Sequence, residues 1–310
     1  MPRSKDPSPR SEQEAFLADV IEHPDDDAPR LVYADWLDDH GDADRAEFIR
    51  LQCEVAKLEQ WDARRPELLR RQKGLLRLHA RQWGEGVVKN LYGAEFRRGF
   101  VEIADLPPKV FLANADDLFR RFPLRRLKLG SSFGDPAVRA LAASPHLARF
   151  TELEIPYSRM TAAGLEALVS SPHVRGLKVL EIDFNGIGPQ GARAVAESPH
   201  LAGLTALTLR SCEIGSAGAE AVAGSPHLAG LEKLDLMVNQ IDDAGARALA
   251  ASPHLVYLAE LSLWNNRVGP AGARALVSVR RPRLMRLYLS CNPLGYEGAL
   301  ALAQSPTSAA

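Results

Sequence analysis

The sequence repeats itself every 27 residues, and this period constrains the fold more than any other feature. The tripeptide Ser-Pro-His marks the period, beginning at Ser144, Ser171, Ser198, Ser225 and Ser252. A glycine keeps the same step, at Gly164, Gly191, Gly218, Gly245 and Gly272. One such unit cannot bury its apolar face alone, so we expect the units to stack and share a continuous core.

Each unit has two halves whose apolar residues follow different periods. Leu234 and Leu236 alternate with polar residues, which predicts a short strand with one buried face. The segment from Gly245 to Ala250 is rich in alanine and spaced like a helix, and the Ser-Pro that follows ends that helix. An Asn or Cys comes three residues after the second strand leucine and predicts a buried ladder that bonds backbone groups at the bend. The ladder positions are Asn185, Cys212, Asn239, Asn266 and Asn292.

The strand half resembles the leucine-rich repeat in its longer, ribonuclease-inhibitor-like form. The family pattern L-x-x-L-x-L-x-x-N/C-x-L is met by LEIDFNGI at residues 180–187 and by its neighbours. Seven units begin near Leu124, Phe150, Leu177, Leu204, Leu231, Leu258 and Leu284. The resemblance implies an α/β solenoid, a right-handed β-α superhelix. The first two units carry Ser132 and Ser158 at the ladder position, which predicts a weaker ladder there.

The segments before the repeats predict a cap and a small helical domain. We expect a disordered tail over residues 1–10, an α-helical domain over 11–85, a solenoid cap over 86–123 and seven repeats over 124–306. The cap is predicted to hold a hairpin turning at Arg97-Arg98-Gly99 and a helix around Ala113 to Arg121. The residues after Gln304 are polar or small, and we expect them to fray.

Capping residues divide the region 11–85 into four predicted helices. Ser11 and Glu14 form a capping box at the start of the first. Asp27 is predicted to cap the second helix, and Gly41 to end it. Asp42 or Asp44 starts the third, and a fourth helix carries the leucines between Leu68 and Leu76 together with Trp83.

The run PDDDAPRLVYADWLDDHGDADRAEFIRLQ, at residues 24–52, closely resembles the bacterial repeat-companion domain. The match is nearly continuous over residues 12–58. That family accompanies repeat arrays and has no established chemistry to carry over. The resemblance implies a bacterial origin and a module that accompanies the repeats.

The inner face of the solenoid is the expected binding surface. Strand residues between the leucines point outward there, because side chains alternate along a strand. Large apolar side chains at such positions are typical interface anchors, and charged side chains beside them are typical polar partners. The predicted contact residues are Tyr157, Asp183, Phe184, Arg210, Asp235, Met237, Trp264 and Tyr288.

We expect a monomer that binds a protein in the cytoplasm. The chain has 38 basic and 39 acidic residues, without the basic excess of a nucleic-acid binder. We expect no secretory signal, because the N-terminus is polar, and no membrane span, because no long apolar run occurs. The cysteines Cys53, Cys212 and Cys291 are far apart, which favours a reducing compartment over disulfides.

The sequence shows no catalytic motif of the hydrolase, zinc-protease or nucleotide-binding kinds, and we expect neither an enzyme nor a cofactor. The histidines of the Ser-Pro-His column form a row rather than a converging zinc site, so we interpret them as turn residues. An acidic cluster lacks the calcium-loop spacing and is interpreted as helix caps and a solvated face. It comprises Asp25, Asp26, Asp27, Asp35, Asp38, Asp39, Asp42 and Asp44. Asp35 and Trp36 with Arg30 and Arg45 are candidates for a buried ion-pair network.

Three functions remain open at this point. The leading hypothesis is a non-catalytic scaffold that binds an unidentified protein on its concave face. The second is regulation of a small GTPase, by analogy with Ran GTPase activators, whose repeats are similar. The third is a structural role in which the N-terminal domain occupies the groove.

Overall fold

The computed structural model describes residues 9–84, 95–279 and 283–304. Contacts divide the chain into two compact units. The first comprises Met1–Leu106 with Ala113–Arg126, and the second Pro107–Leu112 with Leu127–Ala310. Most of the tail predicted over residues 1–10, the segment 85–94 of the predicted domain and cap, and the fraying end after Gln304 lie outside the described residues.

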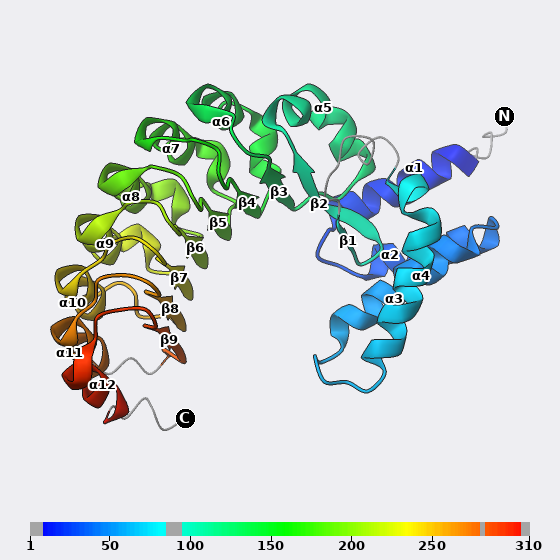
Figure 1. Cartoon of the computed structure of the whole chain (residues 1–310). Coiled ribbons are helices and arrows are strands. Elements are labelled where there is room, and N and C mark those ends of the chain that lie inside the picture. Colours follow the sequence, from blue (N-terminus) through cyan, green and yellow to red (C-terminus); the bar gives the residue numbers. More distant parts are fainter. Residues whose placement is uncertain (1–8, 85–94, 280–282, 305–310) are drawn as a thin grey trace. The chain divides into compact units, whose positions relative to one another are not determined.

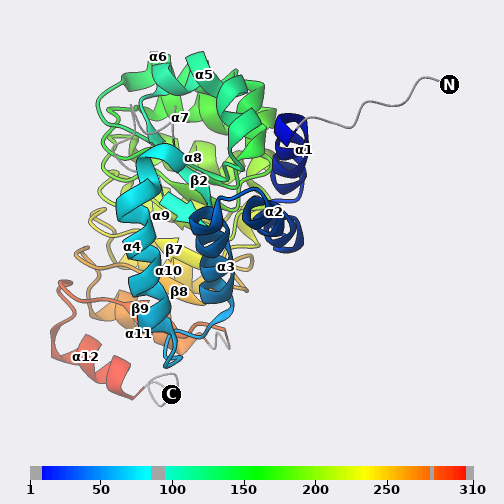
Figure 2. The ribbon, with the colours of Figure 1, turned by 90° about the vertical axis from the view of Figure 1, so that its right-hand side faces the viewer.

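The first unit contains four helices and a β-hairpin (Figure 2). A small apolar core joins the first three helices to the hairpin. Its elements are α1 (Pro9–Glu22), α2 (Ala28–Asp39), α3 (Ala43–Lys57), α4 (Arg65–Trp83), β1 (Glu95–Arg97) and β2 (Phe100–Leu106). The core joins Tyr33 and Leu37 of α2 to Ile49 of α3 and Phe100 of β2. The predicted hairpin is confirmed, and Gly99 at its turn has φ +91. A Cβ there would lie 2.5 Å from Ile49 Cγ1, so the turn needs glycine for close approach as well as for its backbone.

The ends of the first helices follow the predicted caps with two corrections. α1 begins at Pro9, before the expected Ser11. Asp27 stands at the N-cap of α2, but its side chain makes no cap bond. Asp26 Oδ1 accepts from the amide of Ala28 at 2.8 Å instead, which leaves Asp27 to pair with Lys57 at 3.1 Å. The cap of α3 is confirmed at Asp42, whose side chain accepts from the amide of Arg45 at 3.3 Å.

The second unit alternates strands with helices, which confirms the α/β solenoid. In Figure 1 its strands line the inner side of an arc and its helices the outer side. The strands are β3 (Arg126–Leu129), β4 (Glu152–Glu154), β5 (Val179–Glu181), β6 (Ala206–Thr208), β7 (Lys233–Asp235), β8 (Glu260–Ser262) and β9 (Arg286–Tyr288). The helices are α6 (Gly134–Ala142), α7 (Ala162–Val169), α8 (Gly188–Glu197), α9 (Gly215–Ala223), α10 (Asp243–Ala251), α11 (Pro270–Ser278) and α12 (Gly295–Ala303). Before this array comes α5 (Pro108–Arg121), which begins earlier than the predicted cap helix.

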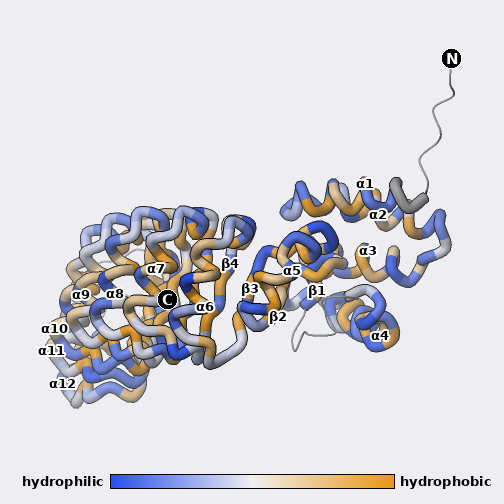
Figure 3. Tube along the Cα trace, turned by 90° about the horizontal axis from the view of Figure 1, so that it is seen from above, coloured by the Kyte–Doolittle hydropathy of each residue, from blue (hydrophilic) through white to orange (hydrophobic). Residues whose placement is uncertain are grey.

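The strands pair in parallel and in register with the sequence period. Leu153, Leu180, Leu207 and Leu234 occupy equivalent positions on consecutive strands, and each is buried. Apolar and polar residues therefore alternate along the chain within each repeat (Figure 3). Helices of the outer row contact their neighbours along the row, so each repeat buries its apolar face on the next.

The predicted asparagine ladder is confirmed by its hydrogen bonds. Asn239 Oδ1 accepts from the amides of Cys212 at 3.0 Å and Ile214 at 3.3 Å, in the preceding repeat. Its Nδ2 donates to the carbonyl of Leu209 at 2.6 Å. Cys212 takes part with a thiol that donates to the carbonyl of Ile182 at 3.0 Å. The ladder thus satisfies backbone groups of two adjacent repeats where each chain leaves its strand.

A second ladder, which the sequence reasoning missed, runs along the Ser-Pro-His column. The proline starts a short 3₁₀ turn, as in η4 (Pro199–Leu201) and η5 (Pro226–Leu228). The serine before it donates across to the repeat behind, from Ser171 Oγ to the carbonyl of Ala142 at 2.6 Å and from Ser252 Oγ to that of Ala223 at 2.5 Å. These carbonyls lie at helix C-termini, which have no partner within the helix. The serine explains the recurrence of the tripeptide better than helix termination alone.

Candidate partner-binding face

The eight predicted contact residues all belong to the strand side of the repeats, but they differ in exposure. Tyr157, Phe184 and Tyr288 are exposed, with Tyr157 at 54% and Phe184 at 43%. Arg210, Met237 and Trp264 are half-buried. Asp183 and Asp235 are buried, at 8% and 4%. The two-residue alternation predicts which side chains point outward. It does not predict that residues of neighbouring repeats cover the short aspartate side chains.

The position directly before the ladder residue adopts a left-handed backbone in six consecutive repeats, although none of these residues is glycine. The φ values run from +50 to +62 at Tyr157, Phe184, Ser211, Val238, Asn265 and Cys291. Bulky and β-branched residues rarely occupy this region, because Cβ approaches the backbone closely there. Strain of this kind persists where surrounding bonds impose it, and the asparagine ladder directly follows this position. The backbone therefore presents Tyr157 and Phe184 in fixed directions.

The two exposed aromatic rings form a stacked pair across adjacent repeats. The ring centroids of Tyr157 and Phe184 are 4.3 Å apart and their planes differ by 6°. Such a pair presents a broad flat apolar surface with little side-chain entropy left to lose on binding. A rigid, exposed apolar area of this kind is suited to contact with the surface of a partner protein.

A charged cluster lies beside the aromatic pair on the next strands. Arg210 bonds Asp235 Oδ2 through Nε and NH2, both at 2.8 Å, and its NH1 lies 3.8 Å from Asp183 Oδ2. Asp183 Oδ1 also accepts from the amide of Arg210 at 3.0 Å. Burial raises the pKa of Asp183 to about 6, against the opposing influence of Arg210. The cluster therefore holds one cation between two carboxylates, and its charge changes below neutrality.

The remaining predicted residues lie farther along the same face. The amide of Met237 donates to Asp235 Oδ1 at 3.1 Å, which places Met237 directly beside the charged cluster. The carbonyl of Trp264 accepts from the amide of Val238 at 3.1 Å, and that of Tyr288 from Leu263 at 2.9 Å. The parallel register places the three on successive repeats, with Tyr288 in the row of Asp235 and Ser262. Met237 and Trp264 lie in a second row, beside the one that holds Tyr157 and Phe184.

The other chemically active side chains of the repeats serve structure. The column histidines are half-buried at the 3₁₀ turns, and His200 Nδ1 accepts from Arg175 Nε at 3.1 Å. In the described parts of the chain, no group of three or more His, Cys, Asp and Glu side chains is arranged to hold a metal. Burial raises the pKa of Cys53 to about 11 and that of Cys212 to about 12, which keeps both as thiols at neutral pH.

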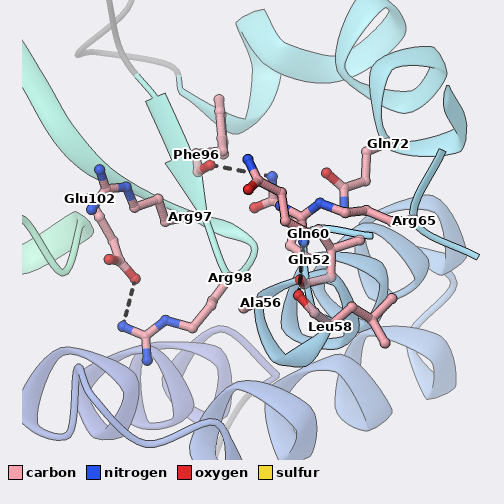
Figure 4. Close-up of a pocket in the computed structure, with 11 residues that line it drawn as sticks. Gln52, Ala56, Leu58, Gln60, Arg65, Gln72, Phe96, Arg97, Arg98 and Glu102 are labelled. Atoms are coloured by element: carbon pink, nitrogen blue, oxygen red, sulfur yellow. Dashed lines mark hydrogen bonds and ion pairs between the residues drawn. The ribbon is translucent and has the colours of Figure 1, made fainter. Parts of the chain in front are cut away.

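The first unit holds ion pairs that sequence spacing predicted incorrectly. Arg30 pairs with Glu102 of β2 at 2.8 Å rather than with Asp35, and Asp35 pairs at the surface with Arg50 at 2.7 Å. Arg98 also reaches Glu102, at 3.3 Å, beside a pocket whose lining includes Gln52 of α3 (Figure 4). Partners 72 residues apart leave no periodic signal in a sequence, so Glu102 was not found.

No helix among the described residues is long and apolar enough to cross a membrane.

Comparisons with known proteins identify the repeats. The family model described as "Leucine Rich repeat" matches residues 176–196, 203–223, 230–250 and 283–303. A comparison with curated protein sequences gave no match. Among solved structures, the chain resembles one from the yeast Rad7–Elc1 complex, at 15% identity and a TM-score of 0.50, over 96% of this chain and 85% of that one. It also resembles an internalin of Listeria monocytogenes, at 17% identity and a TM-score of 0.34, over 59% of each chain.

The matched residues cover units that the sequence period had already defined, and the ladder of asparagine side chains supplies the bonds expected of that pattern. The likeness to the yeast structure shows the fold alone. The second unit of this chain is an α/β solenoid, and four of its repeats match the leucine-rich repeat family.

Proposed function

We propose that this protein is a non-catalytic scaffold that binds another protein on the strand face of its repeats. The observation that carries the proposal is the exposed, stacked pair Tyr157 and Phe184, held by a left-handed backbone beside the cluster of Arg210 with two carboxylates. Aromatic side chains dominate the energetics of protein interfaces when a partner covers them. The yeast structure with a similar fold comes from a complex of two proteins.

The charges on the face favour a protein over a nucleic acid. Arg210 is balanced by Asp183 and Asp235, so the face offers no row of cations to neutralise phosphates. A partner that contacts the cluster must bring groups that replace or extend these bonds, because an unpaired buried charge is costly. Met237 and Trp264 extend the apolar part of the surface away from the cluster.

The finer assignments belong to the same proposal. We infer that the repeats are of the ribonuclease-inhibitor-like form, and that residues 11–85 are a repeat-companion domain of bacterial origin. We also propose that residues 86–123 cap the seven repeats of 124–306, and that the protein acts as a monomer in the cytoplasm without a cofactor.

A photo-crosslinking side chain tests the choice of face. We place it at Asn265, which is exposed on the strand side, and as a matched control at Glu220, which is exposed on the outer helix α9. Irradiation in lysate of the source organism is expected to yield one discrete adduct from Asn265 only. The adduct partner, once purified, should bind Trp264→Ala more weakly than wild type by at least ~1 kcal/mol. Equal labelling from both positions, or unchanged affinity of the variant, would contradict the proposal.

A further inference from the structure

The first unit buries a guanidinium that has no anionic partner. Arg45 of α3 is only 8% exposed, and its guanidinium makes no hydrogen bond or ion pair with the described residues. Aromatic rings surround it instead, with centroids 4.8 Å away at Trp83, 5.3 Å at Phe100 and 5.8 Å at both Phe48 and Phe96. Burial lowers the pKa of Arg45 to about 10, which still leaves it charged at neutral pH.

Two hydrogen-bond donors are left unsatisfied at this place. Arg45 NH1 and Trp83 Nε1 are both buried, and neither has an acceptor among the described residues. Arg30, which is equally enclosed, donates to Glu102 at 2.8 Å and to the carbonyl of Pro24 at 2.7 Å, and only its Nε is without an acceptor. Because a buried donor without a partner costs folding free energy, native proteins rarely leave two together. The pair therefore points to an acceptor that is not among the described residues.

Arg45 and Trp83 line one cavity of about 280 Å³ within this unit. Tyr33, Phe100 and Phe122 contribute apolar walls. Two other charged side chains border the cavity, but both have partners. Asp42 caps α3 by accepting from the amide of Arg45 at 3.3 Å, and Arg121 pairs with Asp117 at 3.5 Å. The guanidinium of Arg45 thus faces the cavity without an ion-pair partner, and the carboxylate of Asp42 lies at the border of the same cavity.

We propose that this cavity binds a small organic monocarboxylate. The carboxylate accepts from the guanidinium of Arg45 and the indole N–H of Trp83, and the apolar part of the ligand packs against the aromatic walls. A guanidinium matches the two oxygens of a carboxylate, and charge-assisted bonds strengthen where water is excluded. A monoanion balances the charge of Arg45, whereas a phosphate dianion would add excess negative charge beside Asp42. The volume is at the lower end for ligand pockets and suits a molecule of the size of benzoate.

Two variants separate ligand binding from a structural role. Arg45→Met removes the charge but keeps an apolar side chain of similar length, so we expect loss of carboxylate binding together with a higher melting temperature of the unliganded protein. A purely structural Arg45 predicts the opposite change in melting temperature. Trp83→Phe keeps an aromatic ring beside Arg45 but lacks the N–H, and its affinity should fall roughly tenfold. Arg71→Met, which breaks only a surface pair with Glu47, is the matched control and should bind as wild type.

The experiment titrates the full-length protein with benzoate, acetate, benzamide and inorganic phosphate, by calorimetry and thermal melting. Benzoate is expected to bind saturably and raise the melting temperature, acetate to do so more weakly, and benzamide and phosphate to do neither. Absence of any shift with both carboxylates at about 10 mM, well above a Kd near 1 mM, would overturn the proposal. Equal binding of benzamide, or undiminished benzoate binding by Arg45→Met, would also overturn it. If that variant does not fold, an unchanged affinity of Trp83→Phe is decisive against the site.

Discussion

At the scale of single residues, the strand face is shaped by backbone strain that side chains in the ladder maintain. Val238 shows this most clearly, because a β-branched residue with φ +57 is the least suited to a left-handed backbone. Its neighbour in the next repeat, Asn265, has nearly the same φ with a side chain that tolerates it. Comparing these two positions separates the free-energy cost of the left-handed backbone from the contribution of side-chain contacts.

Val238→Asn is therefore expected to raise the free energy of unfolding by about 1 kcal/mol, because asparagine relieves the left-handed strain. Urea unfolding of the wild type and the variant measures this difference. Val279→Asn is the matched control, since Val279 is also exposed but has φ −90. A control variant that gains as much stability as Val238→Asn would show that strain is not the cause.

Asp183 makes the stability of the repeats depend on pH. Its pKa is raised in the folded state to about 6 from 3.8, so folding favours the protonated carboxyl. The contribution to stability is fully present below pH 3.8 and is lost as pH rises through about 6. The difference between the two pKa values corresponds to roughly 3 kcal/mol of unfolding free energy at most.

Asp183→Asn removes this titration while keeping an oxygen for the amide of Arg210. Relative to wild type, the variant should become more stable as pH rises from 4 to 7, by roughly 2 to 3 kcal/mol. Urea unfolding at both pH values gives the difference, and other titrating groups cancel between the two proteins. A stability difference that does not change with pH would refute the assigned shift.

Residue chemistry was only partly predictable from the sequence. The ladder asparagines could be found because each recurs at a fixed distance from a strand leucine. The burial of Asp183 and Asp235 could not, because it depends on Arg210 reaching sideways from the repeat between them. Arg45 was predicted to join an ion-pair network with Asp35, which is wrong. Its aromatic surroundings could not be predicted, since the rings come from α3, α4 and the hairpin.

At the scale of elements, the glycine column sets how closely the outer helices approach. A Cβ on Gly218 of α9 would lie 2.7 Å from Ile214 Cβ and 3.0 Å from Ala192 Cβ of α8, the preceding helix. The sequence period located this column, and the structure supplies the reason for it. Strand pairing and helix order were likewise predictable, because one period fixes both. The start of α5 at Pro108 was not, because that helix precedes the repeats.

Gly218→Ala is expected to cost about 1 to 3 kcal/mol of unfolding free energy, because the added methyl group forces adjacent helices apart. Gly186→Ala provides the control in the same unit, since a Cβ at Gly186 meets nothing within 4 Å. Thermal unfolding of both variants measures the contrast. Equal melting temperatures would mean that the helices adjust without cost.

At the scale of the whole molecule, the solenoid behaves as a stack in which each repeat contacts only its neighbours. Deleting residues 204–230 removes one complete period and restores the same Gly-Leu junction that precedes the next repeat. We expect this shortened protein to fold with an unchanged circular dichroism spectrum per residue and a modestly lower melting temperature.

Deleting residues 204–214 instead removes β6 but leaves α9 whole, and we expect loss of cooperative unfolding. Thermal melts of the two deletions, compared with wild type, check the stacking directly. Similar behaviour of the two would contradict the view that the 27-residue unit is the unit of stability.

The asparagine ladder has one further consequence for how such a surface changes over time. The asparagine amides hydrogen-bond the backbone at each bend from the interior of the solenoid. The exposed side chains on the strand face are therefore not needed to hold the backbone. Tyr157, Phe184 and Trp264 lie on different repeats, and adjacent strands are about 4.8 Å apart. Each of these side chains can therefore be substituted without changing the residues on the neighbouring repeats. New specificity is then reachable through single substitutions, each of which leaves the scaffold intact.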